Sequence, residues 1–463
     1  MHRIFDQPKS KNPKVAYFCM EYAVDQCLKI YSGGLGYLAG SHMRSAYELK
    51  QNVLGIGILW SYGYYDQTRS ENQHMNIQYI KKNYSFLTNT GIMFPINIHG
   101  TSVMVQVWYL DPEVFKTAPL FLLTTDIPEN DFLSRTITQK LYDSNAATRI
   151  AQSIILGAGG QKLLETLNQE PDKYHLNEGH GLPLLFQLYQ KYKSLAKLKE
   201  KVVFTTHTPE EAGNEVQSLD LLAEMGFLGD LNKEEVINIM GAEKDVLNYT
   251  LTALRLSGKA NAVSKLHKLT SQEMWGAYKY ICPIISITNA QNQKYWQDAE
   301  LKDIFIKKNK TALVKRKKEL KKSLFKIVAD QTGKIFDENI LTIVWARRFA
   351  GYKRADLIIH DYTRFLNLVT RQECPIQVIW AGKPHPADAH GIAIFNQLID
   401  KTADLTRCAV LTGYELELSE ALKKGADVWL NTPRFPREAS GTSGMSACMN
   451  ATVNLSIADG WFP

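Results

Sequence analysis

Four cationic side chains lie within eight residues in the C-terminal third of the chain. They are Arg347, Arg348, Lys353 and Arg354, and the apolar run 341–345 precedes them. Arginine offers a planar fork of donors and lysine offers a mobile point charge, so the group suits a dense dianion such as phosphate. The same composition is equally typical of an exposed, charged start of a helix. The residue types alone leave both interpretations open.

A loop rich in glycine, serine and threonine follows the next apolar runs. It extends from Asn431 to Ser446, contains the carboxylate of Glu438, and lies between a strand-like segment at 428–430 and a helical pattern. Backbone N–H groups at such a position can approach an anion closely. A loop of this composition also occurs without any ligand.

Three motifs in the first half of the chain carry weaker signals. Glycines at 33, 34 and 36 precede a helical pattern, which fits either an anion-binding loop or a tight turn. Two histidine motifs, 175–181 and 205–211, lie about 30 residues apart. A single histidine after a strand is more often structural than functional.

Taken in order from Val15 to Gly460, these five motifs resemble those of the α-glucan phosphorylases, the glycogen phosphorylase family, in its short bacterial or archaeal form. The resemblance implies an α/β protein with two doubly wound, Rossmann-like domains facing a cleft, the GT-B arrangement. It also implies reversible phosphorolysis of an α-1,4-glucan to glucose 1-phosphate, with retention at the anomeric carbon.

The resemblance also assigns expected roles to individual residues. Arg348 and Lys353 match residues that grip the substrate phosphate, and His207 matches a residue that bonds the sugar 6-hydroxyl; these three form the expected catalytic set. The expected substrate-binding residues are Gly33, Gly34, Leu35, Glu178, Asn289, Tyr352, Glu438, Ser440 and Gly441. The expected cofactor-binding residues are Arg347, Lys353 and Thr442. The residues after Asn289 depart from the family pattern, in which a glycine follows the asparagine. No metal site is expected.

The position of Ser446 breaks the family pattern. In the family this position is the lysine that holds pyridoxal phosphate as a Schiff base, and a hydroxyl cannot form an imine. Lys423 and Lys424 lie on the preceding helix and are not expected to replace it. We therefore expect pyridoxal phosphate to bind only noncovalently, if it binds. Three other interpretations remain open: a cofactor-free retaining glycosyltransferase that uses a nucleotide sugar, an inactive glucan-binding homologue, and a degraded gene product.

Short apolar runs alternate with longer helical patterns, which is typical of β-α-β units and parallel sheets. Strands are predicted at 15–18, 201–206, 341–345, 376–380, 428–430 and 454–458. A run at 307–322 contains nine basic residues and one acid, and we expect a helix with a solvated charged face there. A turn follows it, so the predicted domains are 1–330, which binds glucan or sugar, and 331–463, which binds phosphate or cofactor.

Composition narrows the class of protein. The chain has 463 residues, 45% of them apolar, and a net charge of +7, which suits a small anionic ligand and falls short of a nucleic-acid-binding protein. The six cysteines form no C-x-x-C pair, and we expect buried free thiols, no signal peptide and a cytoplasmic protein without membrane contacts. The second domain reads as shortened at its end, and an uncovered sheet edge there would favour a homo-oligomer.

Overall fold

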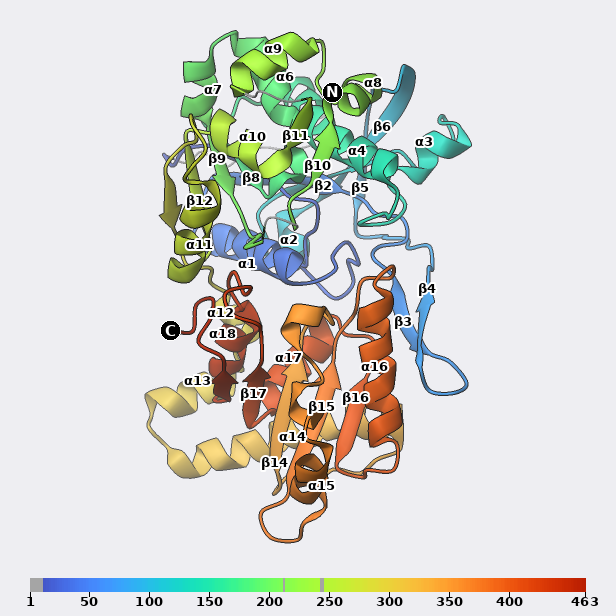
Figure 1. Ribbon diagram of the computed structural model, residues 1–463, viewed down its shortest axis with the longest axis vertical. Coiled ribbons are helices and arrows are strands. Elements are labelled where there is room, and N and C mark those ends of the chain that lie inside the picture. The colour runs from blue at the N-terminus through green and yellow to red at the C-terminus, as the bar shows by residue number, and fades with distance from the viewer. Residues whose placement is uncertain (1–10, 211–212, 242–244) are drawn as a thin grey trace. The chain divides into compact units, whose positions relative to one another are not determined.

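The computed structural model describes residues 11–210, 213–241 and 245–463. The N-terminal segment before Lys11 and Glu211 of the third motif lie outside the described residues. The chain divides into two compact units. Unit 1 contains residues 1–64 and 81–289, and unit 2 contains residues 65–80 and 290–463 (Figure 1).

Unit 1 is built on a nine-stranded sheet in the order β13-β12-β9-β8-β1-β2-β7-β6-β5. The strands from β13 to β7 pair in parallel, and β6 and β5 continue the sheet as an antiparallel hairpin. Their bounds are β1 Val15–Phe18, β2 Val53–Ile58, β5 Thr88–Ile98, β6 Thr101–Leu110, β7 Leu120–Thr124, β8 Lys173–Asn177, β9 Val202–Thr205, β12 Lys259–Ala262 and β13 Ile284–Ser286. A separate antiparallel pair is formed by β10 Val216–Ser218 and β11 Val246–Asn248.

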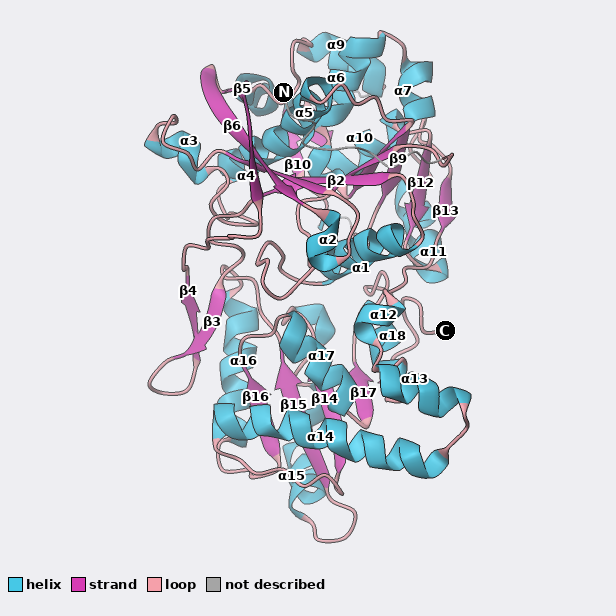
Figure 2. Cartoon of the chain, turned by 180° about the vertical axis from the view of Figure 1, so that it is seen from behind, coloured by secondary structure: helices cyan, strands magenta, loops and turns pink. Residues whose placement is uncertain are grey.

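Helices cover both faces of this sheet. In Figure 2, α1 and α11 lie on one side and the helices around α5, α6 and α10 lie on the other. The helices of unit 1 are α1 Gly34–Glu48, α2 Pro112–Phe115, α3 Phe132–Thr136, α4 Ala146–Ile154, α5 Gly160–Thr166, α6 Pro183–Tyr192, α7 Leu195–Lys201, α8 Leu219–Met225, α9 Lys233–Met240, α10 Tyr249–Leu256 and α11 Lys265–Trp275, with a π-helical turn at Ile155–Gly159 and a 3₁₀ turn at Gly179–Gly181. Coverage on both faces explains why the parallel strands are continuous apolar runs.

Unit 2 is built on a five-stranded parallel sheet in the order β16-β15-β14-β17-β18. The strands are β14 Leu341–Ala346, β15 Ile376–Ala381, β16 Cys408–Leu411, β17 Val428–Asn431 and β18 Val453–Ser456. The helices are α12 Gln293–Trp296, α13 Ala299–Ile306, α14 Lys310–Thr332, α15 Tyr362–Thr370, α16 Ala389–Thr402, α17 Leu416–Gly425 and α18 Thr442–Cys448, with 3₁₀ turns at Gly351–Lys353 and Leu357–Ile359.

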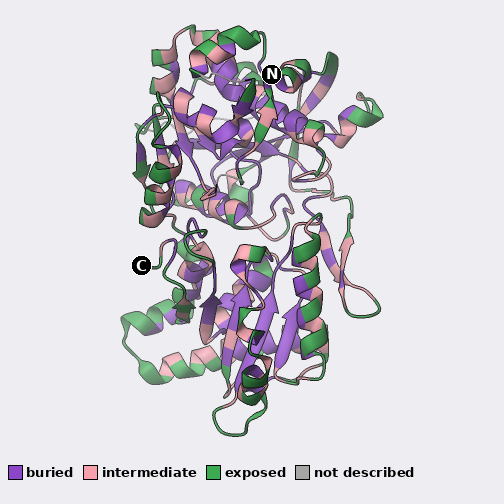
Figure 3. Cartoon of the chain, viewed as in Figure 1, coloured by how far each residue is buried: buried purple, intermediate pink, exposed green. Residues whose placement is uncertain are grey.

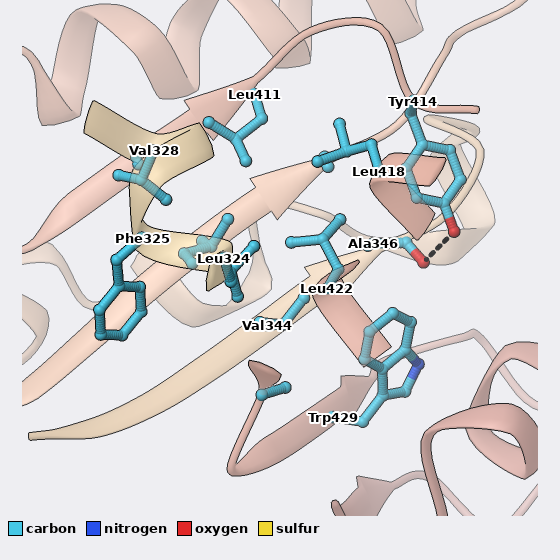
Figure 4. Close-up of a cluster of buried hydrophobic side chains, with 14 of the residues drawn as sticks. Leu324, Phe325, Val328, Val344, Ala346, Leu411, Tyr414, Leu418, Leu422 and Trp429 are labelled. Atoms are coloured by element: carbon cyan, nitrogen blue, oxygen red, sulfur yellow. Dashed lines mark hydrogen bonds between the residues drawn. The ribbon is translucent and has the colours of Figure 1, made fainter. Parts of the chain in front are cut away.

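The core of unit 2 lies between its sheet and helices α14 and α17. Leu324 and Val328 of α14 and Leu422 of α17 are fully buried against Val344 and Leu411 of the sheet (Figure 4). In Figure 3 strands β14 to β17 of this unit are buried along most of their length, the edge strand β18 is partly exposed, and the helices are exposed on their outer faces. The strand ends, and the residues that follow them, are therefore held on a rigid support.

The parallel strands of the two sheets follow one order around the first strand of each unit. Two parallel strands lie on one side of it, β2 and β7 beside β1 and β15 and β16 beside β14, and the chain then crosses to its other side; in unit 1 the chain forms the hairpin β5–β6 before β7. The crossing falls between β1 and β8 in unit 1 and between β14 and β17 in unit 2. In doubly wound sheets, ligands bind beyond the carboxyl ends of the strands at such a switch point.

The six predicted strands are confirmed as β1, β9, β14, β15, β17 and β18, with bounds within two residues of the prediction. The unit division differs from the predicted boundary at residue 330, because α14 packs against α17 and β16 and so belongs to unit 2. The basic face of α14 also differs from the expectation. Lys321 is buried and pairs with Asp427, and Lys317 Nζ donates to the carbonyl oxygens of Lys424, Ala426 and Asn450.

A hairpin from the first part of the chain belongs to unit 2. Its strands are β3 Asp66–Arg69 and β4 Met75–Gln78. Gln67 Nε2 donates to the carbonyl oxygen of Gly382, and Gln67 Oε1 accepts from Gly413 N, each at 3.0 Å. Nothing in the local pattern of this segment predicted its place in the C-terminal unit.

Two further expectations were checked against the described residues. All six cysteines are free, but Cys27, Cys374 and Cys448 are exposed, so the expectation that every thiol is buried is wrong for these three. Within the described ranges, no helix combines the length and the apolar character needed to cross a bilayer.

Candidate functional site

A buried ionic cluster lies at the switch point of unit 2. Glu438 Oε2 accepts hydrogen bonds from Arg347 Nη1 at 3.0 Å and from Lys353 Nζ. All three side chains are about nine-tenths buried or more. The sequence separations are 91 and 85 residues, so the fold rather than local sequence brings these groups together.

The strand ends position each member of the cluster. Arg347 follows the last residue of β14, and the loop that carries Glu438 follows β17, the strand beside β14 in the sheet. Lys353 is the last residue of the 3₁₀ turn Gly351–Lys353. Its backbone N–H donates to the carbonyl oxygen of Ala350 at 2.8 Å. Parallel strands end at one edge of the sheet, which explains why two distant loops converge.

Gly382 is required for this convergence. Its φ is +153°, and a Cβ atom built there would lie 1.9 Å from the carbonyl oxygen of Arg347. An L-residue at this position would therefore force the backbone of β15 away from that of β14 at the residue that carries the cation.

The charges fix the ionisation state of Glu438. Burial opposes its charged form, but the charges of Lys353 and Arg347 outweigh burial, and the pKa of the carboxyl lies below its ordinary value. Arg348 contributes in the same direction, although its side chain is exposed. Arg347, Arg348, Lys353 and Glu438 sum to a net charge of +2 (3 − 1), and Asp459, whose Oδ2 accepts from Glu438 N at 3.0 Å, adds one further carboxylate beside them. The remaining excess of positive charge suits an anion.

The loop before α18 contributes further polar groups. Arg347 Nη2 and Trp429 Nε1 both donate to Ser443 Oγ at 3.3 Å. Among the buried polar atoms of the described residues, Arg347 Nε and Ser440 Oγ have no hydrogen-bond partner. A buried donor without a partner costs about 1–3 kcal/mol, so these two atoms mark a place where an anionic oxygen would be stabilised.

The predicted residues around the loop occupy these positions. Gly441 adopts φ +83° immediately before α18, and Thr442 is the first residue of that helix. Lys353 Nζ lies 4.7 Å from the centroid of the Tyr352 ring. Ser446 is fully buried, and its hydroxyl donates to the carbonyl oxygen of Thr442 at 3.2 Å. The Ser446 hydroxyl is thus turned into its own helix.

Unit 1 places a buried carboxylate at its own switch point. Glu21 Oε2 accepts from Ser32 N at 2.6 Å and from Gly33 N at 3.2 Å, and Glu21 Oε1 accepts from the hydroxyl of Tyr142 at 2.6 Å. Burial raises the pKa of Glu21, and the hydrogen bonds only partly offset it. The backbone donors of Ser32 and Gly33, at the start of the predicted anion loop, therefore already have an internal carboxylate as partner, while Gly34 and Leu35 begin α1.

A second carboxylate of unit 1 supports His207. Glu178, which has φ +71°, accepts from His207 N and from Thr208 Oγ1, while His207 Nε2 contacts Asn177 Oδ1 at 2.6 Å. An amide oxygen accepts, so Nε2 carries the ring proton and Nδ1 keeps a lone pair. Burial lowers the pKa of His207 to about 3, and the ring is neutral at ordinary pH.

The predicted site residues divide between the two units. The set of unit 2 contains Arg347, Arg348, Tyr352, Lys353, Glu438, Ser440, Gly441, Thr442 and Ser446, and the set of unit 1 contains Gly33, Gly34, Leu35, Glu178, His207 and Asn289. Asn289 is the last residue of unit 1, where its backbone N–H donates to the carbonyl oxygen of Val263 at 2.9 Å.

Several residues of these sites were not singled out from the sequence. Glu21 and Asn177 support unit 1, and Ser443 and Asp459 support unit 2, where Asp459 Oδ2 accepts from Glu438 N at 3.0 Å. Glu21 and Asp459 each follow the end of a strand by three residues, β1 for Glu21 and the edge strand β18 for Asp459. A carboxylate shortly after a predicted strand was the available signal for both.

Fold and site together define a doubly wound α/β protein with a buried, net basic cluster in its C-terminal unit. A family model for carbohydrate phosphorylases matches residues 285–461. The chain is 33% identical to maltodextrin phosphorylase of Thermococcus litoralis over 515 residues and 30% identical to glycogen phosphorylase of Aquifex aeolicus over 518 residues. It covers 61% and 74% of the lengths of these two relatives, and they cover 98% and 97% of the chain. This chain belongs to the carbohydrate phosphorylase family.

A relative from Methanocaldococcus jannaschii, described as an uncharacterized protein, is 50% identical over 446 residues, which are 96% of this chain and 85% of that protein. The chain spans about 60% of the length of the maltodextrin phosphorylase and of the glycogen phosphorylases of Mycobacterium. Membership of the family therefore supports a phosphorylase-like glycosyltransferase, whereas the reaction itself is a matter for proposal.

Proposed function

We propose that this protein transfers a hexosyl group between an α-1,4-glucan and inorganic phosphate, giving glucose 1-phosphate with retention at the anomeric carbon. The bond from the anomeric carbon to the glucan 4-oxygen breaks, and a bond from that carbon to a phosphate oxygen forms. The proton of the phosphate goes to the departing 4-oxygen. The observation that carries the proposal is the net charge of +2 built by Arg347, Arg348, Lys353 and Glu438 at a switch point.

The cations of unit 2 hold the phosphate in this proposal. Arg348 and Lys353 grip the substrate phosphate, and the carboxylate of Glu438 accepts a sugar 3-hydroxyl while it keeps both neighbouring cations oriented. Hydrogen bonds to charged groups contribute about 1.5–3 kcal/mol each, so the cluster can bind and orient a dianion without further groups. In unit 1, the lone pair of the neutral His207 ring suits a sugar hydroxyl donor rather than a proton transfer.

The residues of unit 2 also fit the phosphate of pyridoxal phosphate. Arg347 has a buried Nε without a partner among the described residues, Lys353 ends the 3₁₀ turn that follows β14, and Thr442 begins α18. Bound there, the cofactor would supply a second phosphate that exchanges a proton with the substrate phosphate. Ser446 provides no covalent anchor, so these contacts and the packing of α18 must orient the group.

A phosphorolysis assay tests the proposal. The purified full chain is incubated with maltoheptaose, phosphate and pyridoxal phosphate, and release of α-glucose 1-phosphate is followed by ³¹P NMR. We expect release with wild type and none with Lys353→Met. Absence of product, together with product formation from a nucleotide sugar and maltoheptaose, would replace phosphorolysis by nucleotide-sugar transfer. Absence of both would make the protein a binding homologue.

A further inference from the structure

The segment 459–461, which we call the strap, holds the loop that carries Glu438. Asp459 begins the strap three residues after the end of β18 and is only 3% exposed. Its Oδ2 accepts from Glu438 N at 3.0 Å, and its Oδ1 accepts from Gly460 N at 2.8 Å. One buried carboxylate therefore ties the backbone of the loop to the backbone of the strap.

The end of the strap holds the middle of the same loop. Trp461 N donates to the carbonyl oxygen of Ser440 at 3.0 Å, and the indole Nε1 of Trp461 donates to that of Gly441 at 3.0 Å. The strap thus engages three of the four residues 438–441 through their backbone groups. A loop rich in glycine and serine has many conformations open to it, and these hydrogen bonds select one.

The side chain of Glu438 lies against the strap as well. A Cβ atom built at Gly460 would lie 3.3 Å from Glu438 Cγ and 2.3 Å from the carbonyl oxygen of Ser440. One built at Gly441 would lie 3.5 Å from Glu438 Cγ. The stem of Glu438 is therefore seated on two glycines. The two cations of the cluster contact Oε2, which leaves Oε1 as the oxygen for a further donor.

The cations and the strap constrain Glu438 in different ways. The Lys353 ammonium is a point charge on a flexible stem, so it can follow the carboxylate through a small displacement. A hydroxyl that donates to Oε1 requires a fixed distance and angle, and a displacement of about 1 Å is enough to lose such a contact. The strap also holds Ser440, whose buried Oγ has no partner among the described residues. The strap therefore determines where the loop can accept a ligand hydroxyl.

We propose that Asp459 and Trp461 are positioning residues that give this site its selectivity for a hexose with a free 3-hydroxyl. The inference rests on the proposed function, in which Glu438 accepts that hydroxyl, and it names what sets the selectivity of that contact. Asp459 acts through the backbone of Glu438, and Trp461 acts through the carbonyl oxygens of Ser440 and Gly441. When either contact is lost the loop relaxes, so the 3-hydroxyl loses its acceptor while the other sugar contacts remain.

Binding of glucose and of 3-deoxyglucose to the full chain tests this inference without turnover. Titrations followed by saturation-transfer NMR give the ratio of the two dissociation constants. We expect wild type to prefer glucose by about 10-fold or more, as for one hydrogen bond to a charged group. Trp461→Phe keeps an aromatic ring and removes the indole N–H, and Asp459→Asn leaves one acceptor oxygen for two N–H donors. In both variants the preference should fall to about twofold or less, with the affinity for 3-deoxyglucose nearly unchanged.

A core variant separates positioning from stability. Val369 is buried on α15, at the other end of unit 2 from α18 (Figure 1), and Val369→Ala removes core packing without touching the loop. It should lower the midpoint of urea denaturation and keep the wild-type ratio. A purely structural role of the strap would likewise weaken the binding of both sugars by one factor.

The outcomes distinguish the inference from the proposed function. If wild type prefers glucose and both strap variants keep that preference, the inference is overturned while the proposed role of Glu438 stands. If wild type binds the two sugars equally, the proposed contact between Glu438 and the 3-hydroxyl is wrong, and the inference falls with it. Trp461→Phe decides alone if urea denaturation shows that Asp459→Asn is unfolded. The phosphorolysis assay remains a separate measurement.

Discussion

Unit 1 and unit 2 place carboxylates at the same point of the same strand order, and these carboxylates differ in what surrounds them. Glu21 and Glu178 of unit 1 accept hydrogen bonds from backbone N–H groups and neutral hydroxyls, and burial raises the pKa of both. Glu438 of unit 2 lies between Arg347 and Lys353, and its pKa is lowered. One topology therefore supports a neutral polar site in one unit and a cationic site in the other.

The comparison shows that the cationic cluster is built by side chains that follow the strands, whereas the glycine loop of unit 1 has no such cations among the described hydrogen-bond partners of Ser32 and Gly33. Gly33 and Gly34 drew attention in the sequence, yet nothing lies within 4 Å of a Cβ atom built at either one. Gly382, which belongs to no predicted motif, is sterically required beside the candidate site, and so is Gly460, where a Cβ atom would lie 2.3 Å from the carbonyl oxygen of Ser440. A carboxylate from within unit 1 already satisfies Gly33 N.

Removal of Lys353 should have the largest effect and test the charge difference directly. We expect Lys353→Met to weaken phosphate binding by about 10- to 100-fold, the equivalent of one charged hydrogen bond. It should also destabilise unit 2 by about 3 kcal/mol, because the buried Glu438 loses one of its two cations. Calorimetric titration with phosphate and urea denaturation measure the two effects. Lys326→Met, on the exposed face of α14, is the control, and equal behaviour of the two variants would refute the charge argument.

Two glycine substitutions test the steric difference between Gly382, which follows β15, and Gly34, which begins α1. Gly382→Ala should cost about 3 kcal/mol or more of stability, because both its φ and its contact with the Arg347 carbonyl forbid a side chain. Gly34→Ala, at the start of α1, should be neutral or stabilising by up to about 1 kcal/mol. Urea denaturation of both variants checks this, and a mild effect of Gly382→Ala would show that β14 and β15 can separate.

The carboxylates should respond to pH with opposite signs. Glu438 has a lowered folded pKa, so its contribution to stability is present above the unfolded value of 4.5 and is lost as pH falls. Glu178 has a raised folded pKa, so folding becomes less favourable as pH rises above 4.5. Wild type should therefore gain stability with pH relative to Glu438→Gln and lose it relative to Glu178→Gln. Urea denaturation across the acidic pH range measures the stability difference between wild type and each variant. If both differences changed with pH in the same direction, the contrast between Glu438 and Glu178 would be wrong.

The smallest effect is expected at His207. Its neutral ring offers a sugar hydroxyl one acceptor, so His207→Ala should weaken glucose binding by about 1 kcal/mol, or about fivefold. The loss should be the same at about pH 5 and about pH 8, because a pKa of about 3 leaves the ring uncharged at both. Saturation-transfer NMR with glucose at the two pH values is the measurement. A loss that grows at acidic pH would mean that the ring is protonated in the protein.

Much of the fold followed from local pattern. The segments 15–18, 341–346 and 428–431 are short apolar runs that only a sheet covered on both faces can bury, and each became a strand. The motifs after these strands singled out Arg347, Lys353 and Glu438 in separate roles before any geometry was known. Residue type, order and spacing determined the family.

The tertiary structure determined which of the charged residues are buried and paired and which are exposed. The lysines of α14 looked alike in sequence, yet Lys317 and Lys321 became internal anchors while Lys318 and Lys322 stayed exposed. Lys423 became a buried amine beside Trp296, and the hairpin 65–80 joined unit 2. Periodicity specifies which face of an element is apolar, but desolvation and pairing depend on groups that lie as far as 85 to 315 residues away along the chain. Those contacts exist only once the sheets have formed, so no local pattern could have specified them.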